Sequence, residues 1–75
     1  MQDVIVVTLD KIVFEGKAHS VMLPGEQGVF EVLDYHKPLV SRLVKGNVIV
    51  DQNVFAIRRG MVGVQSNKTT IIMEE

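Results

Sequence analysis

Apolar residues along this chain occur in short runs that are separated by glycine, proline, asparagine or aspartate. Runs of roughly four to eight residues with such boundaries are typical of strands joined by turns. The pattern therefore predicts a meander of hairpins, with strands over residues 4–8, 12–15, 18–23, 29–33, 39–44, 47–50, 54–58, 61–65 and 69–73.

The residue types within the runs support this interpretation. Valine, isoleucine and threonine make up 23 of the 75 residues, and β-branched side chains lose rotamer freedom in helices but pack well on a pleated sheet. Residues 39–44 fit a helical face as well as a strand, because the run is too short for periodicity to decide. The expected fold class is all-β, a sandwich or barrel that forms one domain over residues 1–75.

Three turns are predicted from their residue types. Pro24 presets the first central position of a type II turn, and Gly25 is expected at the second, where φ is positive. Aspartate and asparagine within 51–53, and Ser66-Asn67, are residues that cap their own turns between strands.

Composition narrows the function classes. The chain has no cysteine, so it holds no disulfide, and His19 and His36 are too far apart in sequence to suggest a metal site. A net charge of −1 and only four aromatic residues argue against a nucleic-acid partner. No apolar run approaches the roughly 20 residues of a membrane span, and the start of the chain is unlike a secretory signal. A cytoplasmic-type compartment is expected.

No catalytic constellation emerges from the sequence. His19 and Ser20 are adjacent in a predicted strand, so their side chains should point to opposite faces. Asp34 and His36 are close enough in sequence to hydrogen-bond, but no nucleophile accompanies them. Residues 25–28 lack the Lys-Ser/Thr of a phosphate loop and lead into a strand. We therefore expect a non-catalytic module that works by contact.

Ordered motifs then identify a family. The series covers nearly the whole chain, in register, and comprises Phe14-Glu15-Gly16, Val21-Met22-Leu23-Pro24-Gly25-Glu26-Gln27-Gly28-Val29-Phe30-Glu31-Val32-Leu33, His36-Lys37-Pro38-Leu39, Lys45-Gly46, Val54-Phe55-Ala56-Ile57 and Gly60-Met61-Val62-Gly63-Val64-Gln65-Ser66-Asn67. In this series the chain resembles the epsilon subunit of F-type ATP synthases. A lone Pro-Gly pair is a weak signal, whereas the ordered series is specific.

The resemblance implies a small flattened β-sandwich of about nine to ten short strands, at the foot of the rotary central stalk. Such a subunit docks the gamma subunit to the c-ring and couples proton-driven rotation to ATP synthesis, without cofactors or bond chemistry. It is a peripheral part of the complex on the cytoplasmic face of an energy-transducing membrane, with no membrane insertion.

The resemblance also assigns residues to partners. The c-ring-facing loop corresponds to Glu26, Gln27, Gly28 and Val29, and the gamma-facing positions correspond to His36 and Ser41. Pro24 and Gly25 form the structural turn before the loop.

The chain departs from the family pattern at several positions. Glu31 stands where the family often has glycine, Asp34-Tyr35 replaces Pro-Gly, and Arg58-Arg59 replaces a small residue and glycine. Val29 is apolar where some members are acidic, which predicts an apolar ring contact. Family members usually continue into two helices beyond the position of Glu75, so their inhibitory and nucleotide-sensing roles are not assigned to these 75 residues.

Two other function classes compete with this interpretation. A lipoyl or biotinyl carrier is also a small β-sandwich, but it displays a modifiable lysine at a hairpin tip, and Lys45 and Lys68 lack the flanking residues of that family. A small β-barrel for single-stranded nucleic acid is disfavoured by charge and by aromatic content. A small β adaptor module of another kind is the remaining alternative.

Overall fold

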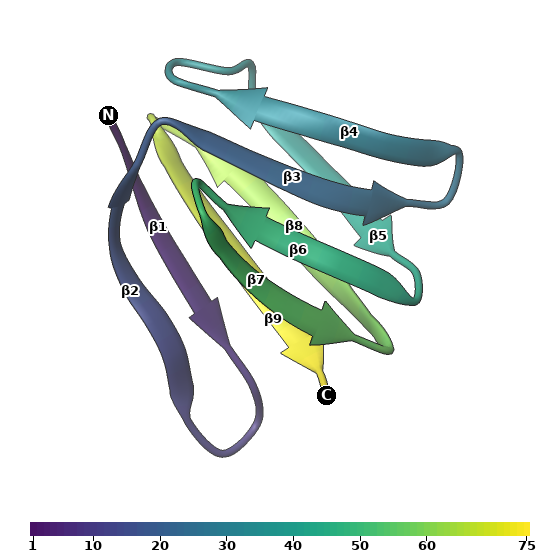
Figure 1. Cartoon of the computed structure of the whole chain (residues 1–75). Helices are drawn as coiled ribbons and strands as arrows, with labels where there is room; N and C mark the ends of the chain where they lie inside the picture. Colours follow the sequence, from purple (N-terminus) through teal and green to yellow (C-terminus); the bar gives the residue numbers. More distant parts are fainter.

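The computed structural model describes all 75 residues, and every regular element in it is a strand (Figure 1). The nine strands are β1 (Gln2–Val7), β2 (Ile12–Ala18), β3 (Ser20–Gly25), β4 (Gly28–Leu33), β5 (Leu39–Leu43), β6 (Gly46–Val50), β7 (Asn53–Ile57), β8 (Arg59–Gln65) and β9 (Lys68–Glu74). The all-β prediction is confirmed, and each predicted run corresponds to one strand.

The strands form one curled sheet in the order β2-β1-β9-β8-β5-β3-β6-β7, with β4 paired to the other side of β3. The sheet folds over where β5 meets β3, because these two strands share a single residue pair, Gly25 with Leu43. Two layers result, one of β2, β1, β9, β8 and β5 and one of β4, β3, β6 and β7 (Figure 1). An edge-to-face contact between Phe14 and Phe55, with ring centroids 6.1 Å apart, joins β2 to β7 across the layers.

The expected meander is wrong in its long-range pairings. Four sequential hairpins are present, β1–β2, β3–β4, β6–β7 and β8–β9. However, β1 pairs in parallel with β9, and β5 pairs with β8. Both pairings bring distant segments together so that the inward faces of the two layers bury one another.

The core lies between the layers and is almost entirely aliphatic. Its buried members are Val4, Val6, Ala18, Val21, Leu23, Val32, Leu43, Val48, Val50, Ile57, Val62, Val64, Ile71 and Met73. They alternate with outward-facing residues along each strand, as a sheet with a period of two requires. Full burial of each large aliphatic side chain contributes about 1.5–3 kcal/mol.

The ambiguous segment 39–44 is a strand. Leu43 is buried and Leu39 half-buried, whereas Val40 and Arg42 between them are exposed. That alternation is the signature of a strand with one face on the core.

Two of the predicted turns carry the expected backbone. Ser66 and Asn67 both have positive φ, 51° and 57°, as the two central residues of a type I′ hairpin require. Asp51 has φ 52° at the start of the β6–β7 turn. Its carboxylate accepts hydrogen bonds from the backbone N–H groups of His19 and Ser20, at 3.1 and 3.0 Å. This contact lies at the corner where β2 ends and β3 begins, so Ala18 closes β2 and does not open the next strand as predicted.

Candidate partner-binding surfaces

The predicted loop Glu26–Val29 stands at one end of the sandwich, at the β3–β4 hairpin. Glu26 and Gln27 form the tip, and Gly28 follows with φ 123°. All four residues are exposed, and the side chain of Val29 is 67% exposed although it is aliphatic. The loop is thus exposed to solvent, and Val29 is its apolar residue.

The turn expected at Pro24-Gly25 is wrong in its geometry. Both residues belong to β3 and are buried, and the positive φ of this hairpin belongs to Gly28. Gly25 is required for space: a Cβ there would stand 2.8 Å from Cε1 of Phe30 and 3.0 Å from the carbonyl oxygen of Gly28. A side chain at Gly25 is therefore excluded by packing, and not by backbone conformation.

His36 and Ser41 do not share one site. His36 is half-buried in the β4–β5 connection, where its ring Nδ1 lies 2.7 Å from the carbonyl oxygen of Lys37. Ser41 is half-buried on β5 and lines a hollow of about 390 Å³ together with residues 25–30 and Leu39. Ser41 thus borders the loop that the resemblance assigns to the c-ring.

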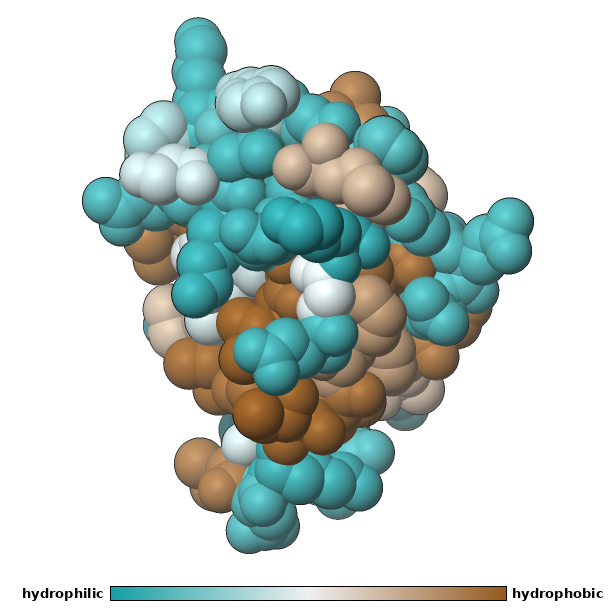
Figure 2. Space-filling view, turned by 90° about the vertical axis from the view of Figure 1, so that its left-hand side faces the viewer, coloured by the Kyte–Doolittle hydropathy of each residue, from teal (hydrophilic) through white to brown (hydrophobic).

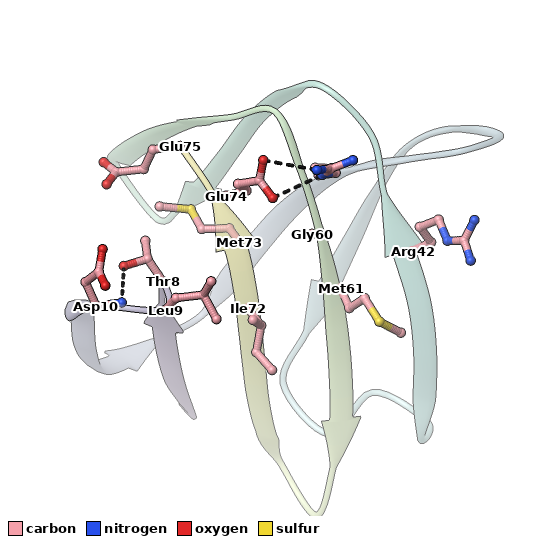
Figure 3. Close-up of a pocket in the computed structure, with 11 residues that line it drawn as sticks. Thr8, Leu9, Asp10, Arg42, Gly60, Met61, Ile72, Met73, Glu74 and Glu75 are labelled. Carbon is pink, nitrogen blue, oxygen red and sulfur yellow. Dashed lines mark hydrogen bonds and ion pairs between the residues drawn. The ribbon is translucent and has the colours of Figure 1, made fainter.

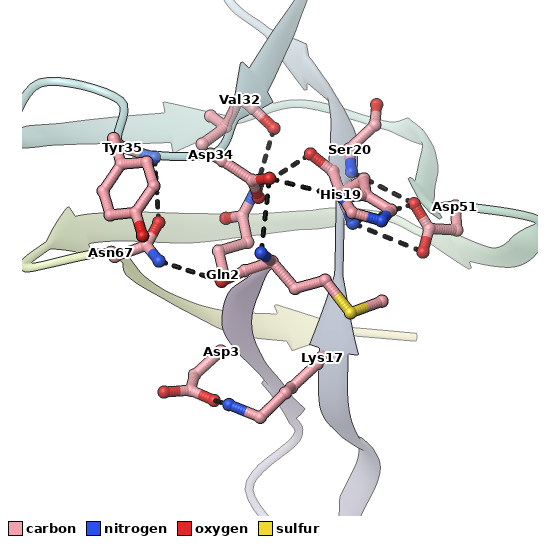
Figure 4. A network of polar contacts seen from close by, with 11 residues as sticks. Gln2, Asp3, Lys17, His19, Ser20, Val32, Asp34, Tyr35, Asp51 and Asn67 are labelled. Atoms are coloured by element: carbon pink, nitrogen blue, oxygen red, sulfur yellow. Dashed lines mark hydrogen bonds and ion pairs between the residues drawn. The ribbon is translucent and has the colours of Figure 1, made fainter.

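A polar network ties the ends of several strands together (Figure 4). Gln2 is buried: its side-chain amide donates to the carbonyl oxygen of Val32 at 3.0 Å and accepts from the hydroxyl of Thr69. Asn67 accepts from the backbone N–H of Tyr35 and donates to the carbonyl oxygen of Met1. These bonds hold β1, β4 and the β8–β9 turn in register.

Asp34 is the charged member of the network. Its Oδ2 lies 3.3 Å from Nδ1 of His19 and 3.4 Å from the amino group of Met1. The hydrogen bond between Asp34 and His36 that sequence spacing allowed is not formed, and the ring Nδ1 of His36 lies against the carbonyl oxygen of Lys37 instead. Asp34 is 29% exposed, and its hydrogen bond with His19 is the main reason that the pKa of its carboxyl lies below the usual value.

Stability is expected to fall in mild acid. Asp3, hydrogen-bonded to Lys17 at 2.9 Å, also has a lowered pKa for that reason. Carboxyls with a lower pKa in the folded state stabilise the fold above their unfolded pKa of about 3.9, and this stabilisation is lost as the pH falls through the folded value. The urea midpoint should therefore decline between about pH 5 and pH 2. An Asp34→Asn, Asp3→Asn double variant should show a smaller decline; an equal decline would contradict the assignment.

The outer face of the β1-β9-β8-β5 layer carries an apolar patch beside Arg42, which lies opposite Met61. Ile72 of β9 lies opposite both Val7 of β1 and Met61 of β8. Ile72 is 53% and Met61 50% exposed, and Val40 on β5 is 76% exposed. On the side of the molecule where β1 and β2 lie, Figure 2 shows hydrophobic side chains gathered in the middle and lower middle, with hydrophilic ones above and below them. We call Val7, Val40, Met61 and Ile72 the outer apolar face.

The sequence reasoning missed the outer apolar face, although a signal was present. Leu39-Val40 and Ile71-Ile72-Met73 are apolar at consecutive positions, so both faces of these strands carry apolar side chains. Such runs differ from the alternation of apolar and polar residues that is typical of a strand with one face in water.

A cleft of about 600 Å³ lies at the end of this face (Figure 3). Leu9, Met61 and Ile72 line it together with Arg42. Beside them the guanidinium of Arg59 donates to both carboxylate oxygens of Glu74, at 3.1 and 3.3 Å. The pair that departs from the family pattern, Arg58-Arg59, is thus engaged within the chain, since Arg58 also lies 3.8 Å from Glu74.

The other candidate sites considered from the sequence are a metal site and the His19-Ser20 pair. No group of three or more His, Asp or Glu side chains is arranged to hold a metal ion. Ser20 donates to Glu31 at 2.5 Å, whereas His19, at the corner between β2 and β3, lies beside Asp34, so the two neighbours have different partners. No helix of the structure has the length and hydrophobicity to cross a membrane.

Comparison with known proteins finds one family and relatives that share one name. The family model described as ATP synthase, Delta/Epsilon chain, beta-sandwich domain matches residues 1–75. An ATP synthase epsilon chain of Chlorobaculum tepidum is 36% identical, over 93% of this chain and 85% of the relative. An ATP synthase epsilon chain of Bordetella avium is 34% identical, over 92% of this chain and 52% of the relative. The chain thus spans most of one relative and about half of the other.

Solved structures show the same fold at lower identity. A chain of the Euglena gracilis mitochondrial ATP synthase, in a structure of OSCP, F1 and c-ring, superimposes with a TM-score of 0.87 at 18% identity, covering 96% of this chain and 49% of that one. A chain from the central stalk and c-ring of the Tetrahymena thermophila mitochondrial ATP synthase gives 0.83 at 15% identity, covering 97% and 63%.

Proposed function

Because this chain belongs to the family of ATP synthase delta/epsilon chain β-sandwich domains, we propose that it is an epsilon-type component of the central stalk of an ATP synthase. It docks the gamma subunit to the c-ring and passes rotation of the ring to gamma. It carries out no bond chemistry. It lies as a peripheral part of the complex on the cytoplasmic face of an energy-transducing membrane.

The observation that carries the proposal is a two-layer scaffold that exposes apolar side chains at places far apart on its surface. Two of these places are the outer apolar face of the β1-β9-β8-β5 layer and the single residue Val29 at the β3–β4 hairpin. Torque transfer requires firm contact with two bodies at once, and exposed apolar surface supplies such contact. The relatives named epsilon chain and the central-stalk structure of Tetrahymena support the same placement.

Gamma docks on the outer apolar face in this proposal. Val40, Met61 and Ile72 form its centre, because they project from neighbouring strands of one layer. Of the gamma-facing positions implied by the resemblance, His36 lies three residues before β5, whereas Ser41 projects to the opposite side of β5 from Val40, toward the hollow beside the β3–β4 hairpin. A subunit seated on the outer apolar face is therefore close to His36 in the chain, and Ser41 is not part of that face.

The c-ring meets the loop Glu26–Val29. This loop is the tip of a hairpin, so it can enter a shallow depression between protein loops without disturbing the sandwich. Val29 makes an apolar contact there, and Glu26 adds one negative charge at the rim.

A Val29→Asp variant is expected to fold normally and to bind the c-ring about 30-fold more weakly. Val29 is largely exposed, so the folded state loses little, whereas a buried carboxylate without a partner costs about 2 kcal/mol or more at an interface. Val54→Asp is the matched control, because Val54 on β7 is also exposed and lies outside both proposed surfaces. Unfolding of Val29→Asp, or equal ring affinities for the two variants, would contradict the assignment.

Reconstitution tests the proposal as a whole. The chain is mixed with purified gamma and detergent-solubilised c-ring, and co-elution is followed by size-exclusion chromatography. We expect a ternary complex at micromolar concentration. Absence of binding to gamma at that concentration would refute the proposal. Family membership also removes the reason to consider a lipoyl or biotinyl carrier at Lys45 or Lys68.

A further inference from the structure

The free edge of β4 is an unpaired row of backbone hydrogen-bonding groups. β4 pairs only with β3, and it is one of the two outermost strands of its layer (Figure 1). Edge strands of this kind are templates for a strand from another chain unless they are protected.

Pro24 fixes which groups of β4 are free. It lies opposite Val29, has no N–H, and its carbonyl oxygen accepts from Val44 on the side away from β4, at 2.8 Å. Val29 and Pro24 therefore form a non-hydrogen-bonded pair. In an antiparallel ladder every second pair is of this kind, so the next two are Glu31 with Met22 and Leu33 with Ser20. The N–H and C=O groups of Val29 and Glu31 thus point outward from the sheet. The C=O of Leu33 accepts from His36, which ends the open stretch.

The side chains along this edge form a regular pattern. Val29, Glu31 and Leu33 all project to the outside, and all three are exposed. Glu31 stands between the two apolar residues, and Ser20 donates to its Oε2. On the inner side, the hollow lined by Phe30 and Leu39 opens next to the same edge. The edge therefore offers backbone groups, one charge, and apolar contacts on both sides.

The position of Glu31 disfavours a second copy of this chain. An antiparallel pairing of two β4 edges that sets Val29 opposite Leu33 places Glu31 opposite Glu31. Like charges directly opposite each other on neighbouring strands are destabilising. A strand with a cation at that position is favoured instead.

We propose that the free edge of β4 binds an extended segment of a partner protein that carries lysine or arginine opposite Glu31, with apolar residues two positions before and after it. The segment adds a strand to β4 by bonding to the N–H and C=O groups of Val29 and Glu31. Its alternate, inward-facing side chains cover Phe30 and Leu39 at the hollow. The edge shares Val29 with the loop proposed to meet the c-ring, and it lies outside the outer apolar face.

Two synthetic peptides test the proposal with the intact chain. Both contain an alternating apolar segment with polar flanks, and they differ only in having lysine or glutamate at the centre. Binding is measured by NMR titration, and protection of the Val29 and Glu31 amides by hydrogen exchange. We expect the lysine peptide to bind at least tenfold more tightly than the glutamate peptide, and to protect both amides.

The variant Glu31→Lys is the decisive control. It should retain the fold and bind the glutamate peptide more tightly than the lysine peptide. A Glu31→Thr variant removes the like-charge opposition and is expected to dimerise more readily than the wild type, which sedimentation measures. Three results would each overturn the proposal: no binding of either peptide, an unchanged preference in Glu31→Lys, or a wild-type chain that dimerises through β4 without peptide.

Discussion

A Gly60→Ala variant is expected to lose about 2–3 kcal/mol of folding free energy. Gly60 lies in the middle of one layer, paired with Leu43 of β5 and Met73 of β9. A Cβ there would stand 2.5 Å from the carbonyl oxygen of Ile72 and 3.1 Å from Cα of Met73. Both atoms belong to the backbone of a hydrogen-bonded strand, so they cannot move aside without distorting the ladder.

Gly63→Ala is the matched control, because it lies in the same strand and no atom lies within 4 Å of a Cβ built there. Thermal unfolding followed by circular dichroism separates the two variants. For a domain of this size, 2–3 kcal/mol lowers Tm by on the order of 10–20 °C. Equal Tm values for the two variants would contradict the close approach of β8 and β9.

An Ile72→Glu variant is expected to bind gamma about 30-fold more weakly or worse. Ile72 is at the centre of the outer apolar face, opposite Val7 and Met61, and central interface residues commonly contribute about 2 kcal/mol or more. The carboxylate is solvated in the free chain, so the loss falls on the complex. Calorimetric titration of gamma measures the effect.

Val54→Glu is the control for this change, since it places the same charge on an exposed strand position of the other layer. Its affinity for gamma should equal that of the wild type. A normal affinity for Ile72→Glu would exclude the outer apolar face as the gamma surface.

The strands were predictable because each is defined by local signals. Short β-branched runs and the positive-φ residues Ser66 and Asn67 mark where strands lie and where they reverse. The motif series that resembles the epsilon subunit predicted the family, which the comparisons confirm.

The long-range pairing was not predictable in this way. The parallel ladder of β1 with β9 joins the two ends of the chain, and no turn specifies it. It depends on the packing of the inward faces of the two layers against each other. It also depends on contacts such as the hydrogen bond from the hydroxyl of Thr69 to the side chain of Gln2. The same non-local folding brings His19 beside Asp34, whereas sequence spacing suggested only that Asp34 could reach His36.

Gly25 illustrates why residue types alone mislead. Pro-Gly is a strong turn signal, yet the hairpin places its tip two residues later, at Glu26-Gln27. Gly25 is instead required by the ring of Phe30, a contact that depends on the pairing of β3 with β4. The exposed apolar residues are a similar case, because only the sheet order shows that Val40, Met61 and Ile72 share one face.

Site-directed photo-cross-linking in the reconstituted complex tests the central claim most directly. A photoreactive residue replaces Met61 in one preparation and Val29 in the other, and the cross-linked subunit is identified by mass spectrometry. We expect gamma to be captured from position 61 and subunit c from position 29. Capture of neither subunit, or of the same subunit from both positions, would contradict a domain that bridges gamma and the c-ring through two separate surfaces.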